Sequence, residues 1–285
     1  GKYAKDYQVN LSAPYYAVTV LHISTQSLPE EEREDPFLLA MAVKKYAEEQ
    51  VDERWNSRFV IYLGDIIMIS QLQEKDDLIA YTDEMDRLCR MARKVCNARV
   101  TAGIGYLCDS LEQIPFSYQG AKQAVSYRVL YGNTRSISIS EVEPGETAEL
   151  QRVDAYADLI QRIIKKIRVG EENVLQEAIH DFIQWLNEAH LSMQNYRIVM
   201  MELISELVRF AAGHDLSIDN VSGTGTDAYH QALQMESTEA LEKWLLDLCR
   251  HLQREVLHER QDSTKSFVQS AEEYVKTNYA DQDLS

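Results

Sequence analysis

The chain has 285 residues, of which 45% are hydrophobic and 26% charged, and its formal net charge is −17. This length accommodates two ordinary domains, and the composition is that of a folded globular protein rather than a disordered or fibrous one. No run approaches the roughly 20 apolar residues of a membrane helix, and the excess of acidic residues argues against DNA binding by this stretch alone.

The first part of the chain alternates strand and helix patterns. Residues 15–23 (YYAVTVLHI) are aromatic and β-branched, which predicts a buried strand. Asp35-Pro36 is typical of a helix N-cap followed by proline, and the helix is expected to run to about residue 54. Residues 59–63 and 66–69 are short apolar runs around Gly64-Asp65, which indicates a tight hairpin.

The pattern continues with a helix, a strand, a helix and a short strand. Residues 76–96 are amphipathic and 99–107 (RVTAGIGYL) are strand-like, whereas 136–140 (SISIS) alternate with period two. Between them, Ser110 and Gln113 predict a capping box for a helix that ends at Gly132. This mixed order predicts an α+β fold with an antiparallel-rich sheet and helices on one face.

No strand pattern follows residue 149, so an all-helical domain is expected. Its helices are predicted at 150–168, 171–189, 196–212 and 238–258, with breaks at Gly170 and at 220–226. A further helix at 266–279 is predicted to start at its own Ser-x-x-Gln capping box and to place Val268, Ala271, Tyr274 and Val275 on one face. The predicted domains are therefore 1–145, 146–262 and 263–285, with the first boundary near 143–146.

The spacing of the cysteine and histidine residues does not by itself identify a functional site. The four cysteines, Cys89, Cys96, Cys108 and Cys249, form no CxxC pair, which favours buried thiols in a reducing, cytoplasmic setting. His251 and His258 lie two helical turns apart near Cys249, but a zinc site needs at least three protein ligands, and a solvated helix face is the preferred interpretation.

Two glycine motifs also lack the context that phosphate binding requires. Gly103-Ile104-Gly105 lies within a strand and has Cys108 where a third glycine would stand, which excludes a dinucleotide fingerprint. Gly223-Thr224-Gly225 joins two predicted helices and is interpreted as a loop. No catalytic, cofactor-binding, metal-binding or DNA-binding residue is therefore assigned to this chain, and no cofactor is expected.

Three segments together resemble the second half of a GGDEF domain. They are 100–105 (VTAGIG), 117–127 (SYQGAKQAVSY) and 131–133 (YGN), which are similar to the TxSxG strand, the A-D-x-A-x-Y helix and the closing G-x-N of that family. In this register, residues 63–67 (LGDII) occupy the signature hairpin and residues 22–24 (HIS) occupy the D-x-D position of the first strand. The resemblance implies a GGDEF-like, ferredoxin-like fold for residues 1–145.

The same resemblance implies a loss of catalysis. A diguanylate cyclase holds two divalent metals with carboxylate oxygens. Asp65 is the one acid of that set that remains, because His22, Ser24 and Ile66 stand at the other positions. The domain is thus expected not to be an enzyme, although nucleotide or cyclic-dinucleotide binding without turnover stays open, supported by Asp65 and the glycines of the fourth strand.

The C-terminal stretch carries a second resemblance. Residues 270–285 (SAEEYVKTNYADQDLS) are similar to the opening of an AraC-type DNA-binding domain, which reads A-x-x-Y-I-x-x-N-Y-x-D-x-x-L-S and carries two helix-turn-helix units. Together the two resemblances imply the regulatory part of a bacterial AraC-family transcription regulator, of the two-component response-regulator type. Its expected partners are a second copy in a homodimer, DNA through a domain beyond Ser285, and an upstream receiver domain paired with a sensor histidine kinase; an upstream membrane sensor fits the sequence as well.

Overall fold

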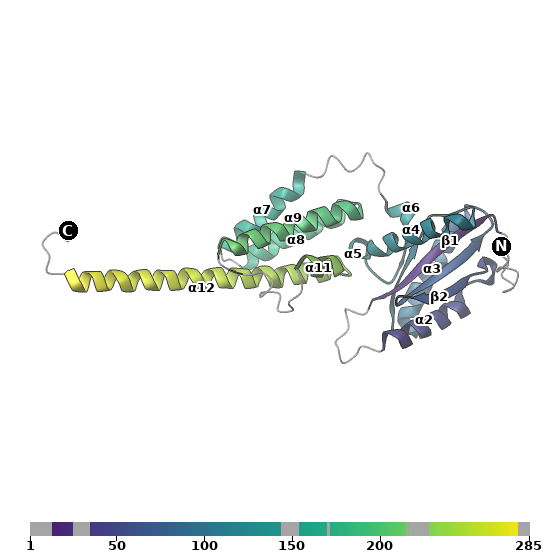
Figure 1. Cartoon of the computed structure of the whole chain (residues 1–285), viewed down its shortest axis with the longest axis horizontal. Helices are drawn as coiled ribbons and strands as arrows, with labels where there is room; N and C mark the ends of the chain where they lie inside the picture. Colours follow the sequence, from purple (N-terminus) through teal and green to yellow (C-terminus); the bar gives the residue numbers. More distant parts are fainter. Residues whose placement is uncertain are drawn as a thin grey trace. The chain divides into compact units, whose positions relative to one another are not determined.

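The computed structural model describes residues 13–24, 35–143, 154–169, 172–214, 216 and 228–278. The chain divides into two compact units (Figure 1). The first contains Gly1–Gln151 together with Leu186–Tyr196 and Met235–Ala240, and the second contains Arg152–Trp185, Arg197–Gln234 and Leu241–Ser285. Among the described residues, no helix combines the length and apolar character needed to cross a membrane.

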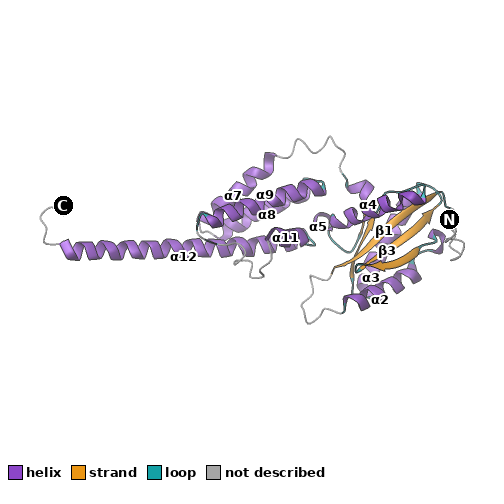
Figure 2. Cartoon of the chain, in the orientation of Figure 1, coloured by secondary structure: helices purple, strands orange, loops and turns teal. Residues whose placement is uncertain are grey.

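The first unit is built on one five-stranded sheet, drawn in orange in Figure 2. Its spatial order is β2-β3-β1-β4-β5, and every neighbouring pair is antiparallel except β4 and β5, which are parallel. This arrangement confirms the predicted α+β, antiparallel-rich fold. The strands are β1 (Tyr15–Ser24), β2 (Arg58–Tyr62), β3 (Asp65–Leu72), β4 (Arg99–Ile104) and β5 (Ser136–Ser138).

The helices of this unit begin and end largely where local sequence directs them. Asp35 caps α2 by accepting a hydrogen bond from the Phe37 amide, and Gly132 ends α5 with φ of +84°. Ser110, however, makes no side-chain cap bond, so the predicted capping box is wrong. The helices are α2 (Pro36–Gln50), α3 (Asp77–Val95), α4 (Ile114–Ser126), α5 (Arg128–Tyr131) and α6 (Ile139–Val142), with single turns η2 (Glu53–Trp55) and η3 (Leu111–Gln113).

Helices cover both faces of the sheet, which corrects the expectation that they lie on one face. Ala17 and Leu21 of β1 belong to the core that includes residues of α2 and α3. The alternate β1 residues Val18 and Val20 pack instead with Ala121 and Val125 of α4. Both faces of β1 are therefore buried, which explains why its sequence is almost continuously apolar.

The hairpin turn is placed one residue earlier than the sequence indicates. Leu63 and Gly64 have φ of +52° and +85° and form the turn, whereas Asp65 is the first residue of β3. Positive φ at two successive positions is the geometry of a two-residue hairpin whose twist matches that of the strands. Asp65 thus has a fixed strand position rather than a loop position.

The second unit contains only helices among its described residues. Amphipathic α7, α8 and α9 bury their apolar faces, and the first half of α12 supplies Leu241, Leu245 and Leu252 to the core of this unit. Figure 1 shows α12 continuing well past α7, α8 and α9. The helices are α7 (Asp154–Val169), α8 (Glu172–Glu188), α9 (Met193–Ala212), α11 (Ala228–Gln234) and α12 (Thr238–Asn278).

The helices of this unit differ from the sequence predictions in two places, and other predictions concern residues outside those that the structure describes. A single 41-residue helix, α12, replaces the two helices predicted at 238–258 and 266–279, so no helix starts at 266. α11 is a helix that the sequence patterns did not predict. The breaks at Gly170 and 220–226 and most of the boundary near 143–146 are outside the described residues, and the domain limits stay predictions.

Candidate functional site

The hairpin brings Asp65 against His22, at the place where the GGDEF signature and the D-x-D motif would meet. Leu21 of β1 pairs with Ile66 of β3 in the antiparallel sheet. His22 follows Leu21 and Asp65 precedes Ile66, so these two residues lie at the next position of the strand pair. The His22 Nδ1 and Asp65 Oδ1 atoms are 2.8 Å apart, and both side chains are about one-quarter exposed, at 25% and 24%. Asp65 is therefore held by an imidazole.

Two further charged residues approach this pair within the first unit. Glu236, which is 7% exposed, places Oε1 4.0 Å from His22 Nε2. Burial lowers the pKa of Arg128, and the negative charges of Glu236 and Asp65 partly offset that effect. His22, Asp65, Arg128 and Glu236, here called the His22 cluster, thus combine two carboxylates with one guanidinium and one imidazole.

The residue before Arg128 fixes another part of the first unit. Tyr127 is fully buried, and its hydroxyl accepts a hydrogen bond of 3.2 Å from the backbone amide of Met193. Tyr127 therefore contacts the segment Leu186–Tyr196, while Arg128 lies beside Glu236 of Met235–Ala240. Tyr127 and Arg128, at the junction of α4 and α5, thus contact the two later segments of the first unit, Leu186–Tyr196 and Met235–Ala240.

The residues at the remaining metal-ligand positions do not fit a magnesium site. Ser24 Oγ is buried without a hydrogen-bond partner among the described residues, and Ile66 is fully buried in the α2–α3 core. Magnesium prefers hard, charged oxygen ligands. Of the positions that the resemblance assigns to metal binding, Asp65 alone offers a carboxylate, and that carboxylate is already bound by His22. Within the described ranges, no group of three or more His, Cys, Asp or Glu side chains could hold a metal ion.

The strand glycines serve packing rather than phosphate binding. A Cβ on Gly103 would overlap the Ala121 carbonyl oxygen, and a Cβ on Gly105 would overlap the Ser117 carbonyl oxygen. Both contacts are with the backbone of α4, which rests directly on β4. The interpretation of these glycines as an approach for an anionic ligand is therefore wrong, because α4 already occupies the space above them.

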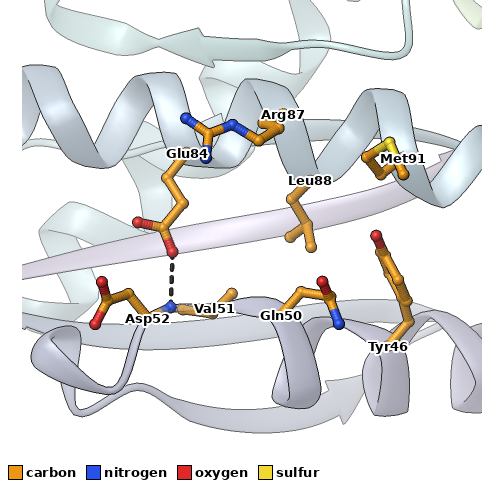
Figure 3. Close-up of a pocket in the computed structure, with 8 residues that line it drawn as sticks. All are labelled: Tyr46, Gln50, Val51, Asp52, Glu84, Arg87, Leu88 and Met91. Carbon is orange, nitrogen blue, oxygen red and sulfur yellow. Dashed lines mark hydrogen bonds between the residues drawn. The ribbon is translucent and has the colours of Figure 1, made fainter.

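A surface pocket lies between α2 and α3 on the opposite face of the sheet (Figure 3). Its volume is about 290 Å³. Glu84 is its fixed polar group, because its carboxylate accepts hydrogen bonds from the Asp52 amide at 2.7 Å and from Trp55 Nε1 at 2.8 Å. The lining residues are Tyr46, Gln50, Val51, Asp52, Glu84, Arg87, Leu88 and Met91.

Arg87 is the cation of this pocket. It is exposed and makes no hydrogen bond or ion pair within the described part of the chain. Apolar Leu88 and Met91 lie on the same helix. The pocket therefore combines an apolar wall with a guanidinium that an anionic ligand could reach, beside the negative charge of Glu84. No sequence motif indicated it, because its residues come from two helix faces and a turn.

The other sequence candidates are not brought into a site. Cys89, Cys108 and Cys249 are buried, Cys96 is half-buried, and none of the four is in a disulfide. His251 lies 3.8 Å from Glu255 on its own helix. The three buried thiols behave as core residues, and burial raises the pKa of Cys89 to about 12.

The comparison with protein families agrees with the sheet architecture. A protein-family model described as "GGDEF-like domain" matches residues 2–127, which span β1 to α4. Comparison with curated proteins and with solved structures gave no match. The chain thus contains a GGDEF-like domain, followed by a helical region.

Proposed function

We propose that this chain, a GGDEF-like domain followed by a helical region, is the signal-relaying part of a bacterial DNA-binding transcription regulator. The proposed regulator is of the AraC type and acts as a cytoplasmic two-component response regulator, with a receiver domain upstream. In this proposal the present chain catalyses no reaction. It passes a conformational signal to DNA-binding units that follow Ser285.

The observation that carries the proposal is the continuity of α12. The helix begins at Thr238, two residues after Glu236 of the His22 cluster, and runs without a break into the AraC-like stretch that starts at residue 270. At 1.5 Å per residue it is about 60 Å long. A change at the His22 cluster would act directly on the start of a helix whose other end enters the proposed DNA-binding domain.

The far end of α12 carries several exposed apolar side chains. Phe267 and Tyr274 are 75% and 63% exposed, and Val268 and Val275 are 48% and 51% exposed. Soluble proteins rarely leave such apolar surface uncovered. Tyr274 and Val275 lie within the AraC-like stretch of residues 270–285, and a further domain formed from that stretch would cover them, which supports the proposal.

A mobility-shift assay tests this proposal. The full-length gene product and the present chain are each incubated with DNA from upstream of the gene and with a scrambled sequence of equal length. We expect the full-length protein to shift the upstream DNA selectively, and the acidic chain of residues 1–285 to shift neither. Absence of sequence preference in the full-length protein would count against the proposal.

Nucleotide or cyclic-dinucleotide sensing is the second candidate, and the pocket of Figure 3 favours it. The two sequence features that supported nucleotide binding are not available to a ligand. Asp65 is bound by His22, and the strand glycines are covered by α4. Arg87 offers a cation for phosphate and the apolar wall offers a surface for a base. The negative charge of Glu84 opposes such a ligand, which makes this the weaker candidate.

Calorimetry separates the two candidates. GTP and cyclic di-GMP are titrated into the chain with and without magnesium, together with the variant Arg87→Ala and the matched control Lys94→Ala on the exposed surface of the same helix. Sensing predicts heat of binding that Arg87→Ala abolishes and Lys94→Ala retains. The relay proposal predicts no heat with either nucleotide.

A further inference from the structure

The pocket between α2 and α3 places opposite charges beside an apolar wall (Figure 3). Glu84, Arg87, Leu88 and Met91 are spaced three, one and three residues apart, so all four lie on one face of α3. In Figure 3, Glu84 and Leu88 extend from α3 toward α2, and Tyr46 extends from α2 toward α3. The pocket thus presents, in order along α3, a carboxylate, a guanidinium and an apolar surface.

The carboxylate of Glu84 is held in place by the turn that follows α2. Its two oxygens accept hydrogen bonds from the Asp52 amide at 2.7 Å and from Trp55 Nε1 at 2.8 Å, and its side chain is 17% exposed. A carboxylate can accept more than one hydrogen bond at each oxygen, so acceptor positions are left for a ligand. A fixed, largely buried carboxylate of this kind is suited to bind an ammonium group, because it needs no reordering on binding.

Arg87 is the complementary cation, one helical turn from Glu84. It is exposed, and none of the described residues makes a hydrogen bond or an ion pair with it. Side chains at this spacing have Cβ atoms about 5–6 Å apart. The ammonium and carboxylate groups of an α-amino acid are attached to the same carbon atom. One small ligand can therefore contact Glu84 with the first group and the long side chain of Arg87 with the second.

The charges around the pocket balance each other. Asp52 Oδ2 lies 3.6 Å from Arg54 Nε, and Arg54 Nη2 lies 3.8 Å from Glu84 Oε2. Arg87 supplies the second guanidinium, so the two carboxylates are accompanied by two cations. A ligand without net charge is compatible with this arrangement, whereas a nucleotide would bring several phosphate charges close to both carboxylates.

The volume and the apolar wall of the pocket limit the ligand further. A volume of about 290 Å³ is what about ten water molecules occupy in the liquid, which is enough for a free amino acid and too small to enclose a dinucleotide. Leu88 is 6% and Met91 is 37% exposed, and Val51 lines the pocket from the end of α2. These residues favour an apolar side chain on the ligand, because the contact removes apolar surface from water.

We propose that this pocket binds a free α-amino acid with an apolar side chain. Glu84 binds the ammonium group of the ligand, Arg87 binds its carboxylate, and Leu88 and Met91 contact its side chain. The inference goes beyond the relay of a signal, because it names the chemical class of a ligand that the domain senses. It also gives a binding role to Glu84, whose negative charge opposes a nucleotide in the same pocket.

Calorimetry with matched ligands tests the role of each charged group. L-leucine, L-isoleucine, L-valine, L-methionine and L-phenylalanine are each titrated into the 285-residue chain. The amino acid that binds most tightly is then compared with its carboxamide, which lacks the carboxylate, and with the corresponding acid that lacks the amino group. Both truncated ligands are expected to bind more than about tenfold more weakly, because each leaves one charged side chain of the pocket without its partner.

Two variants locate these interactions in the pocket. In Arg87→Ala the amino acid and its carboxamide are expected to bind with equal, weakened affinity, since the carboxylate has lost its partner. In Glu84→Gln the amino acid and the acid without an amino group become equal for the same reason. Lys94→Ala, on the exposed surface of the same helix, is the matched control and keeps both the affinity and the preference of the original chain. Circular dichroism melting curves establish that each variant is folded.

Contrary outcomes are equally specific. The inference is overturned if none of the amino acids binds at millimolar concentration, or if the amino acid and its carboxamide bind the original chain equally well. A preference for the amino acid that survives in Arg87→Ala places the binding elsewhere and overturns it too. None of these results bears on sequence-selective DNA binding by the full-length protein, so failure of this inference and failure of the proposed function are measured separately.

Discussion

His22 Nδ1 and Asp65 Oδ1 lie 2.8 Å apart, although the two residues are 43 positions apart in the chain. In the register of the GGDEF resemblance, the His22 imidazole stands where that family has a metal-binding acid, and it binds Asp65 on the neighbouring strand. His22 lies against both carboxylates of the cluster, those of Asp65 and Glu236, and the same two carboxylates act on the Arg128 guanidinium.

The His22–Asp65 interaction predicts a measurable coupling energy. A double-mutant cycle of His22→Ala and Asp65→Ala, followed by urea denaturation, is expected to give a coupling of about 0.5–1.5 kcal/mol, because both groups are partly buried. The i,i+4 pair Lys276–Glu272 on α12, whose side chains are 77% and 64% exposed, provides the control and should couple by about 0.3–0.5 kcal/mol. Coupling near zero at His22–Asp65 would show that the contact does not stabilise the fold.

Tyr81 predicts an alkaline loss of stability. Its hydroxyl is hydrogen-bonded with Thr19 Oγ1 at 2.7 Å and Ser70 Oγ at 3.0 Å, and burial raises the pKa of Tyr81 from 10.0 to about 12. A folded-state pKa above the unfolded value means that the neutral phenol stabilises the fold fully below about pH 10. This contribution is lost as the pH rises from about 10 towards 12.

Tyr81→Phe is therefore expected to lower the free energy of unfolding by about 1–2 kcal/mol at neutral pH and to flatten its decline at alkaline pH. The matched variant Tyr62→Phe changes a phenol that is 55% exposed and should alter neither quantity. Urea denaturation across this pH range measures both effects. An unchanged alkaline slope in Tyr81→Phe would assign the decline to other groups.

The glycines under α4 predict a large packing effect. Gly103→Ala forces a methyl group against the Ala121 carbonyl and is expected to cost about 2–3 kcal/mol or more, because the obstacle is backbone. Gly213→Ala, whose added Cβ would have its nearest neighbour at 3.5 Å, should change stability by about 0.5 kcal/mol or less. Thermal melting compares the two, and equal stability would mean that α4 can move away from β4.

The cysteines predict one fast-reacting thiol per chain. Cys96 is half-buried, whereas Cys89, Cys108 and Cys249 are buried, and burial raises the pKa of each of these three thiols. An aromatic disulfide reagent should modify one thiol quickly and the others only on unfolding. Cys96→Ser should remove the fast phase, and a fast phase that survives this change would indicate local opening around another thiol.

Local sequence patterns predict most of the sheet domain. Apolar β-branched runs locate β1 and the hairpin strands, Asp35 locates the start of α2, and Gly132 locates the end of α5, because each of these signals acts within a few residues. The position of α4 on the second face follows from tertiary packing on Gly103 and Gly105. In the sequence these glycines fail as a dinucleotide fingerprint and otherwise support only the alternative of nucleotide binding, so their packing role is not evident there.

The partners of His22 illustrate what sequence patterns leave undetermined. Its strand position could be predicted from the family resemblance, and so could Asp65 on the hairpin. Glu236 and Arg128 had no such signal, because both reach the cluster through folding of segments that are distant in the chain. The continuity of α12 was also missed, since the Ser-x-x-Gln pattern at 266 resembles a helix start inside a helix.

Quantitative promoter binding tests the central claim most directly. Fluorescence anisotropy measures the affinity of the full-length gene product for DNA upstream of its own gene and for random DNA at the same salt concentration, with the chain of residues 1–285 in parallel. The proposal predicts a preference of about 10³ or more for one upstream sequence by the full-length protein and no binding by the shorter chain. Equal affinity of the full-length protein for upstream and random DNA would contradict it.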